Sequence, residues 1–280
     1  MSEISLEFPD GSKRQFEAGA SAKDVAQSIA ISLAKKAVAG KLDGKLINLN
    51  APINNDGKIE IVTKDSEDGL AVLRSTVALL AKVSLKEIFS DIRFGEDSGD
   101  AEGLYIDTDK DDGQVSADDL EAISTKIQSF VDKKTELKHE SVSKADALKK
   151  LADSKFEAQL VQDSENTSFD FYTVDGVEVL NNGVVFENAG DVKFFRLLSV
   201  AGAYFEGKSS NDMLQRIYGT AFYKQAALDD DLKARQEARE RDHRVIGNDL
   251  DLFFVDPKVG AGLPYWMPNG ATIRRTIERY

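Results

Sequence analysis

The spacing of apolar residues changes within residues 194–222, which read FFRLLSVAGAYFEGKSSNDMLQRIYGTAF. Up to residue 201 the side chains alternate with the period of a mostly buried strand. The polar run Ser209 to Asn211 then marks a turn and offers a cap for a following helix. After the turn, apolar residues recur at three- and four-residue spacing, at Met213, Leu214, Ile217, Tyr218, Ala221 and Phe222. This stretch therefore predicts a strand, a turn and a helix that build a core.

Residues 1–64 alternate near their start and follow a helical period further on. Apolar residues alternate over 4–8, and a Pro-Asp-Gly turn follows, so residues 12–16 are expected to complete a hairpin. Ser21 and Asp24 have the spacing of a capping box, which predicts a helix with an apolar stripe through Leu33. Two further short strands are predicted, at 46–49 and 58–62. One hairpin, one helix and short strands in about sixty residues match the plan of a β-grasp domain.

Residues 65–226 mix helical and strand-like periods. Helical spacing predicts helices over 70–89, 116–131 and 145–152, the last capped by Ser143. Shorter apolar runs predict strands at 104–107, 157–161, 169–174, 176–180 and 184–186. Because helices and strands are interspersed and joined by short connections, an α+β architecture is favoured over a doubly wound sheet.

The remaining residues are predicted to be mainly helical. In 227–248 acidic residues crowd the start and basic residues the end, which suits the dipole of one continuous helix. Its polarity indicates a bridge between domains. Residues 271–280 are predicted to form a final helix that reaches Tyr280 without a capping signal, as expected at the cut end of a fragment.

Composition narrows the chemistry. The 280 residues are 41% hydrophobic and 30% charged, as in soluble globular proteins. There are no cysteines, which excludes disulfides, thiolate nucleophiles and cysteine-ligated zinc. The two histidines, His139 and His243, lie far apart in the sequence, so no metal site is predicted. Because no apolar run reaches membrane-spanning length and no signal peptide is evident, a cytoplasmic location away from membranes is expected.

Charge argues against one class of function. A net charge of −13 disfavours non-specific nucleic-acid binding by the surface as a whole. Carboxylates gather over 96–112, whereas 233–244 is basic on balance. A solvated surface is the ordinary interpretation of both segments, but a local basic contact with nucleic acid stays open.

Three phrases resemble a single family: LLSVAGAYFEGKSSNDMLQRIYGTAF, ARERDHRVIGNDLDLF and GLPYWMPNGATIRRTIERY. Together they resemble the N-terminal part of bacterial threonyl-tRNA synthetases. The earlier phrases PDGSKRQFEAG and KLDGKLINLN resemble the TGS module, a ubiquitin-like β-grasp domain found in these enzymes. The resemblance implies four parts: a TGS-like domain over 1–64, a larger α+β editing-type domain over 65–226, a linker helix over 227–248 and the beginning of a class II catalytic domain over 249–280.

The resemblance also singles out positions in the editing-type domain. In the family, this domain hydrolyses serine wrongly attached to threonine tRNA. It uses two histidines four residues apart on a helix, then an aspartate, a cysteine, a third histidine and a lysine. The matching positions here hold Arg74, Ala78, Val179, Asn181, Val185 and, for the lysine, Glu157. Because none of these side chains is an ordinary base at neutral pH, the resemblance implies an editing fold without catalytic residues.

The resemblance implies partners and cofactors as well. Family members join threonine to its tRNA with ATP, but the motifs for ATP and magnesium and the zinc ligands would lie beyond residue 280. No cofactor is therefore expected in this chain, and a homodimer is implied only for the full-length family. Threonine tRNA is the expected partner. Arg239 and Arg241 of the linker are candidate phosphate contacts, although a solvated or domain-facing role is more common for such residues.

A non-enzymatic alternative remains open. TGS and editing-like domains could form a free-standing module that binds tRNA or a protein partner. The open-ended final helix favours the synthetase interpretation over this one. The reading frame after Tyr280 distinguishes the two, because a synthetase continues into its ATP-binding motifs and zinc ligands.

Overall fold

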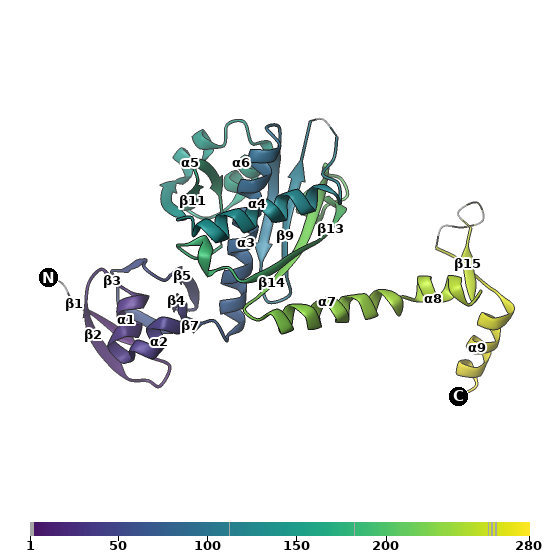
Figure 1. Cartoon of the computed structure of the whole chain (residues 1–280), viewed down its shortest axis with the longest axis horizontal. Coiled ribbons are helices and arrows are strands. Elements are labelled where there is room, and N and C mark those ends of the chain that lie inside the picture. The colour runs from purple at the N-terminus through teal and green to yellow at the C-terminus, as the bar shows by residue number, and fades with distance from the viewer. Residues whose placement is uncertain (1–2, 112, 182, 257, 259, 261) are drawn as a thin grey trace. The chain divides into compact units, whose positions relative to one another are not determined.

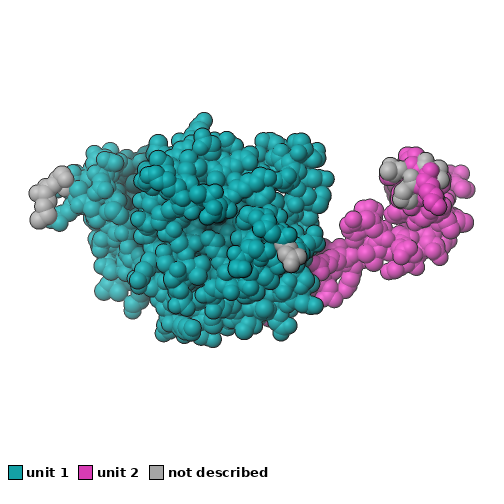
Figure 2. Space-filling view, turned by 90° about the horizontal axis from the view of Figure 1, so that it is seen from above, with its two compact units in different colours: residues 1–225 teal, residues 226–280 magenta. Residues whose placement is uncertain are grey.

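The computed structural model describes residues 3–280 except 112, 182, 257, 259 and 261 (Figure 1). The chain divides into two compact units, residues 1–225 and 226–280 (Figure 2). Helices and strands are interspersed throughout, which confirms the predicted α+β class. None of the described helices is both long and apolar enough to cross a membrane.

The first sixty residues form a mixed sheet with two short helices. The elements are β1 (Glu3–Glu7), β2 (Lys13–Glu17), β3 (Ala20–Ser21), α1 (Ala22–Ile29), α2 (Ile31–Lys36), β4 (Ala37–Leu42), β5 (Lys45–Asn48), β6 (Pro52–Ile53) and β7 (Gly57–Thr63). The sheet order is β2-β1-β7-β4-β5, with β1 and β7 parallel. A small core between the sheet and α1 contains Ile4, Leu6, Val25, Ile53 and Ile59. This is the predicted β-grasp plan.

The capping box forms as predicted, but the helix after it is shorter. The Ser21 hydroxyl accepts a hydrogen bond from the Asp24 amide, and the Asp24 carboxylate accepts one from the Ser21 amide. The helix that begins there ends at Ile29, because Ala30 adopts an extended conformation. The part of the predicted stripe around Leu33 therefore belongs to a separate helix, α2.

Within the described residues, the rest of the first unit contains two antiparallel sheets and four helices. The elements are α3 (Glu67–Ile88), β8 (Arg93–Gly99), β9 (Leu104–Asp109), α4 (Asp119–Lys133), β10 (Lys138–Ser143), α5 (Lys144–Lys150), α6 (Lys155–Asp163), β11 (Ser168–Val174), β12 (Val177–Leu180), β13 (Phe194–Tyr204) and β14 (Met213–Phe222), with 3-10 turns at Ala189–Asp191 and Phe205–Gly207. The sheet orders are β13-β14-β9-β8 and β10-β11-β12. Side chains of α3 and α4 share the main core with β9 and β14.

The predicted helix over 213–222 is wrong, because these residues form strand β14. This strand pairs with β13 on one side and with β9 on the other, so its backbone is satisfied by two ladders. Glu206 and Gly207 have positive φ angles of 54° and 69° and reverse the chain between β13 and β14. Over ten residues the apolar positions fit either period, and the long-range pairing decides between them.

Two of the predicted strands are also wrong. Residues 157–161 lie in helix α6, which buries Phe156, Glu157 and Val161 on one face. Residues 184–186 make no ladder: the Val185 amide donates to the Asn48 side chain, and the Phe186 amide donates to the Thr76 hydroxyl. Side chains therefore satisfy the backbone donors that a neighbouring strand would otherwise bind.

The second unit contains α7 (Gln225–Glu240), α8 (His243–Asp249), β15 (Phe253–Val255), β16 (Pro264–Trp266) and α9 (Pro268–Glu278). The single helix predicted over 227–248 is wrong, because the chain breaks at Asp242. The Asp242 carboxylate accepts a hydrogen bond from the Arg244 amide at 2.8 Å and so caps a new helix. The predicted final helix is confirmed as α9, with Pro268 in its first turn.

Candidate functional site

Arg74 and Ala78, the first two positions of the predicted editing site, lie on α3. This helix is buried almost all round from Val72 to Leu85. A Cβ atom on Gly99 would lie 2.2 Å from the Ser75 amide nitrogen, so the end of β8 approaches the helix as closely as a glycine allows. The two positions therefore lie inside the unit rather than at an open surface.

The Arg74 guanidinium is bound by the surrounding structure. Its side chain is 2% exposed, and Nη1 donates to the Asp100 carbonyl at 2.8 Å. Nε and Nη2 lie 3.3 Å from the Ala221 carbonyl and the Thr220 hydroxyl, and the group lies over the Phe222 ring at 4.9 Å. These contacts join α3 to β14, and they leave the guanidinium poorly placed to act on a substrate.

The other predicted positions also belong to packed structure. Ala78, Val179 and Val185 are buried in one hydrophobic core. Asn181 is fully buried, with its Nδ2 donating to the Gly183 carbonyl at 2.8 Å. Its Oδ1 accepts no hydrogen bond from the described residues. The fold thus brings α3 and the segment after β12 together, through apolar packing and the hydrogen bond from the Phe186 amide to the Thr76 hydroxyl.

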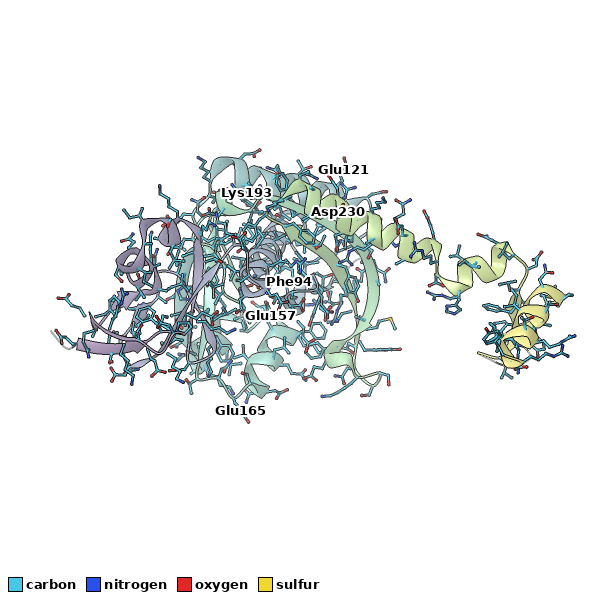
Figure 3. All side chains as sticks on the ribbon, turned by 90° about the horizontal axis from the view of Figure 1, so that it is seen from below. Phe94, Glu121, Glu157, Glu165, Lys193 and Asp230 are labelled. Carbon is cyan, nitrogen blue, oxygen red and sulfur yellow. The ribbon has the colours of Figure 1, made fainter. Side chains whose placement is uncertain are left out.

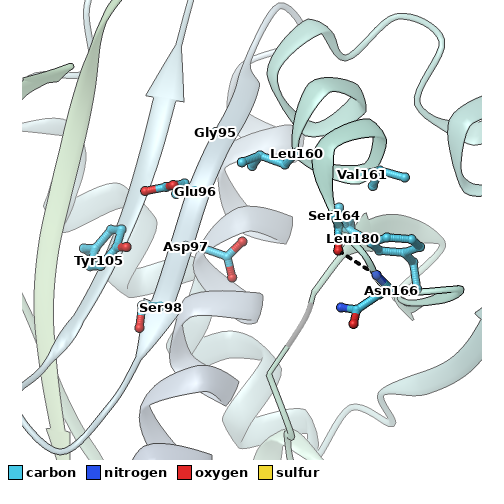
Figure 4. Close-up of a pocket in the computed structure, with 11 residues that line it drawn as sticks. Gly95, Glu96, Asp97, Ser98, Tyr105, Leu160, Val161, Ser164, Asn166 and Leu180 are labelled. Atoms are coloured by element: carbon cyan, nitrogen blue, oxygen red, sulfur yellow. Dashed lines mark hydrogen bonds between the residues drawn. The ribbon is translucent and has the colours of Figure 1, made fainter. Parts of the chain in front are cut away.

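A cavity of about 370 Å³ opens beside these residues, between β8 and α6 (Figure 4). Glu96, Asp97 and Ser98 of β8 and Tyr105 of β9 form one wall. The opposite wall is formed by Leu160, Val161, Ser164, Asn166, Phe169 and Leu180. None of the five positions listed for the editing pocket, from Arg74 to Val185, lines the described cavity.

The β8 wall of the cavity is acidic. Burial raises the pKa of Glu96, and the nearby Asp107 carboxylate raises it further, whereas Arg216 opposes the shift. Arg216 binds Asp107 through two contacts, at 2.6 and 2.8 Å, and its guanidinium stacks 3.9 Å from the centre of the Tyr105 ring. Burial raises the pKa of Tyr105. The wall therefore presents carboxylates and a neutral phenol.

Neither histidine lies in this cavity. His139 is on β10, with Nε2 3.1 Å from the Asp170 carboxylate, and His243 begins α8. Among the described residues, no group of three or more histidine or carboxylate side chains is arranged to hold a metal ion. The cavity can accommodate a polar ligand, and burial raises the pKa of Glu96 in its wall.

Comparisons with known proteins identify the relatives. Residues 4–63 match the TGS domain family. The whole chain is 60% identical to the threonine–tRNA ligase of Levilactobacillus brevis, 54% to that of Pediococcus pentosaceus and 53% to that of Lactiplantibacillus plantarum. The chain is a relative of the threonine–tRNA ligases. These matches cover 100% of the chain but only 43 to 44% of each relative, so the chain spans about two fifths of their length.

This relationship confirms the resemblance carried by the three phrases, but the sequence did not point to the most unusual side chain near the cavity. Lys82 of α3 is fully buried and lies 3.0 Å from Asp97 and 3.1 Å from Glu157. Asp97 lines the cavity, whereas Glu157 is the position matched to a family lysine. A lysine inside the apolar run LLAKVSL was the available signal, because lysine is rarely buried without a partner.

The β-grasp sheet also contacts this region. Asn48 at the end of β5 donates to the Tyr172 hydroxyl at 2.9 Å, and its Oδ1 lies 3.4 Å from the Val185 amide. Burial raises the pKa of Tyr172 to about 12. A second contact joins Asn50 to Glu187. Residues of the TGS domain therefore hold the segment that carries Val185.

Proposed function

We propose that the chain is the N-terminal part of a threonine–tRNA ligase, in which it contacts threonine tRNA and spaces the domains. The identity to such ligases over the whole of this chain, which spans about two fifths of their length, carries this proposal. In it, residues 1–64, 65–226, 227–248 and 249–280 are the TGS domain, the editing-type domain, the linker and the start of the catalytic domain. ATP, magnesium, zinc and homodimer formation belong to the full-length enzyme, and its location is the cytoplasm.

The editing-type domain in this proposal has lost its hydrolytic chemistry. Ester hydrolysis requires a base for the attacking water and donors for the developing negative charge. The packing of Ala78, Val179 and Val185 in a hydrophobic core supports the loss of both at these positions. Arg74 and Asn181 are bound to backbone carbonyls, which supports a structural role for each.

Deacylation of threonine tRNA charged with serine tests this part of the proposal. We expect the ester to be hydrolysed no faster in the presence of the chain than in its absence. A relative that carries the histidines provides the positive control. The Glu96→Gln and Asn181→Ala variants are measured in parallel, because Glu96 is the cavity carboxylate with a raised pKa. Turnover above the uncatalysed rate that either variant abolishes would show that the site is still a hydrolase.

The candidate tRNA contacts lie on and just after α7. Arg239 and Arg241 are exposed, and Arg241 forms an ion pair with Glu237 at 3.2 Å, one helical turn earlier. Such an exposed pair contributes at most about 1 kcal/mol, so both side chains are available to a phosphate at little cost.

Removal of both guanidinium groups tests this contact. We expect Arg239→Ala with Arg241→Ala to weaken tRNA binding and to reduce the slope of log K against log salt by about 1 to 2, because each phosphate contact releases counterions. The measurement is a binding titration at several salt concentrations, with Gln236→Ala on the same helix as the control. Unchanged affinity and slope would place the tRNA elsewhere.

A further inference from the structure

Three ionisable side chains from three elements meet inside the first unit. Lys82 of α3 donates to the Asp97 carboxylate of β8 at 3.0 Å and to the Leu180 carbonyl at 2.7 Å. Its Nζ also lies 3.1 Å from Oε1 of Glu157 on α6. Figure 3 labels Glu157 and Phe94, and the Phe94 ring lies 5.1 Å from the same ammonium. Within the described structure, this cluster is the point at which α3, β8 and α6 are joined by charge.

The charges of the cluster do not balance if every group ionises. The Lys82 ammonium would then face two carboxylates at ion-pair distance, and an excess negative charge is unfavourable where water is largely excluded. Lys86, the next cation on α3, donates its hydrogen bond to the Glu178 carbonyl, so it offsets the negative charge only through its distant charge, which lowers the pKa of Glu157. One of the two carboxyl groups is therefore better neutral.

The two carboxyl groups differ in their surroundings. The Asp97 side chain is 12% exposed, faces the cavity and accepts a hydrogen bond from Lys82. The Glu157 side chain is 2% exposed, and its Oε1 accepts no hydrogen bond of good geometry from the described residues despite its distance from Lys82. Asp97 is thus stabilised as an anion by solvent and by a well-aligned hydrogen bond, whereas Glu157 is shielded from solvent and has Lys82 as its close partner.

We propose that Glu157 keeps its proton in the folded protein at neutral pH, so that the cluster consists of an ammonium, a carboxylate and a carboxylic acid. Helix α6 also carries Leu160 and Val161 of the cavity wall, so the charge of Glu157 affects how that wall packs against α3. Ionisation of Glu157 would place a second negative charge beside Asp97 and loosen α6. The cavity wall is therefore sensitive to alkaline pH.

The groups that face Glu157 support this assignment. Burial raises the pKa of Glu157. The charges of Lys82 and Lys86 on α3 lower this pKa, whereas Asp97 of β8 raises it, and the net direction is upward. Burial lowers the pKa of Lys82, but Asp97 and Glu157 outweigh this effect, so the lysine stays charged. Burial lowers the pKa of Lys86, and Glu157 and then Glu178 of β12 oppose that shift.

The direction of the shift sets the pH window. A carboxyl group whose pKa is higher in the folded than in the unfolded chain stabilises the fold fully below the unfolded pKa. That contribution is lost as the pH rises through the folded pKa. We therefore expect the unfolding equilibrium constant to rise by up to about tenfold per pH unit between the unfolded and the folded pKa, where unfolding releases one proton.

Carbon-13 NMR of the full chain, labelled at glutamate side-chain carboxyl carbons, tests the proposal. At roughly pH 6.5 ordinary glutamates, with a pKa of about 4.3, are ionised. We expect one resonance to remain at the protonated position, to vanish in Glu157→Gln and to persist in Glu178→Gln, a control in which an exposed partner of Lys150 is changed. If every resonance already has the ionised shift at that pH, Glu157 is a carboxylate and the proposal is wrong.

The pH dependence of the free energy of unfolding provides a second, independent test of the proposal. Glutamine reproduces the shape and neutrality of a protonated Glu157. The variant should therefore fold, match the parent below the unfolded pKa of about 4.3, and lack the decline in stability that the parent shows as the pH rises above it. Urea unfolding of both proteins across the pH range measures this difference. Unfolding of Glu157→Gln at neutral pH would contradict the proposal, because it would mean that the negative charge is required.

Discussion

Replacement of Lys82 by methionine is expected to lower the free energy of unfolding of the chain by about 3 to 5 kcal/mol, the usual cost of removing one partner from a buried ion pair. The ammonium is fully buried and contacts Asp97, Glu157 and the Leu180 carbonyl. Methionine fills much of the same volume but offers no donor to any of them. The loss therefore reflects stranded acceptors rather than an empty space.

Urea unfolding at neutral pH measures this effect, and Lys86→Met on the same helix provides a matched control. Lys86 is less deeply buried and donates to one carbonyl, so its replacement should cost about 1 to 2 kcal/mol. Adding Asp97→Asn and Glu157→Gln to Lys82→Met should recover part of the loss, because the stranded carboxylate is then removed. Equal and small losses for both lysines would show that the cluster does not stabilise the fold.

The sequence predicted those elements whose signals are local. The capping box at Ser21, the helical stripe of α3 and the cap at Ser143 all have partners within a few residues, and all three form. Strand β14 was wrongly predicted to be a helix, because apolar residues such as Ile217 and Ala221 fit both the helical and the strand period. Pairing with the preceding β13 and with β9, which is far away in the sequence, selects the strand. The break at Asp242 was missed although its cap is local, because the charge pattern favoured one helix.

The candidate site was predicted in part. Alignment of the sequence with the family's phrases grouped Arg74, Ala78, Val179, Asn181 and Val185. The fold brings α3 and the segment after β12 together. Neither register nor spacing could show that the open space lies beside this group, along β8. Asp97 sits in an acidic stretch that resembles a solvated surface, and Glu157 was assigned to a strand. Their meeting at Lys82 depends on three elements packing together.

Arg74→Met should lower the free energy of unfolding by about 2 to 4 kcal/mol, because buried acceptors lose a charged donor. The carbonyls of Asp100 and Ala221 lose hydrogen bonds, and the Phe222 ring loses its cation. An Arg74 that served only a reacting ester would leave stability nearly unchanged when replaced. The size of the loss therefore separates a structural arginine from a functional one.

Urea unfolding and deacylation are measured together on Arg74→Met. The control is Arg196→Met on β13, where the side chain is exposed and the expected change is within about 0.5 kcal/mol. Large destabilisation with an unchanged, uncatalysed deacylation rate is the expected result. A stable Arg74→Met that alters deacylation would instead assign Arg74 to a working site. Because the guanidinium joins α3 to β14, the expected result would mean that Arg74, a position of the proposed editing site, serves the packing of the fold.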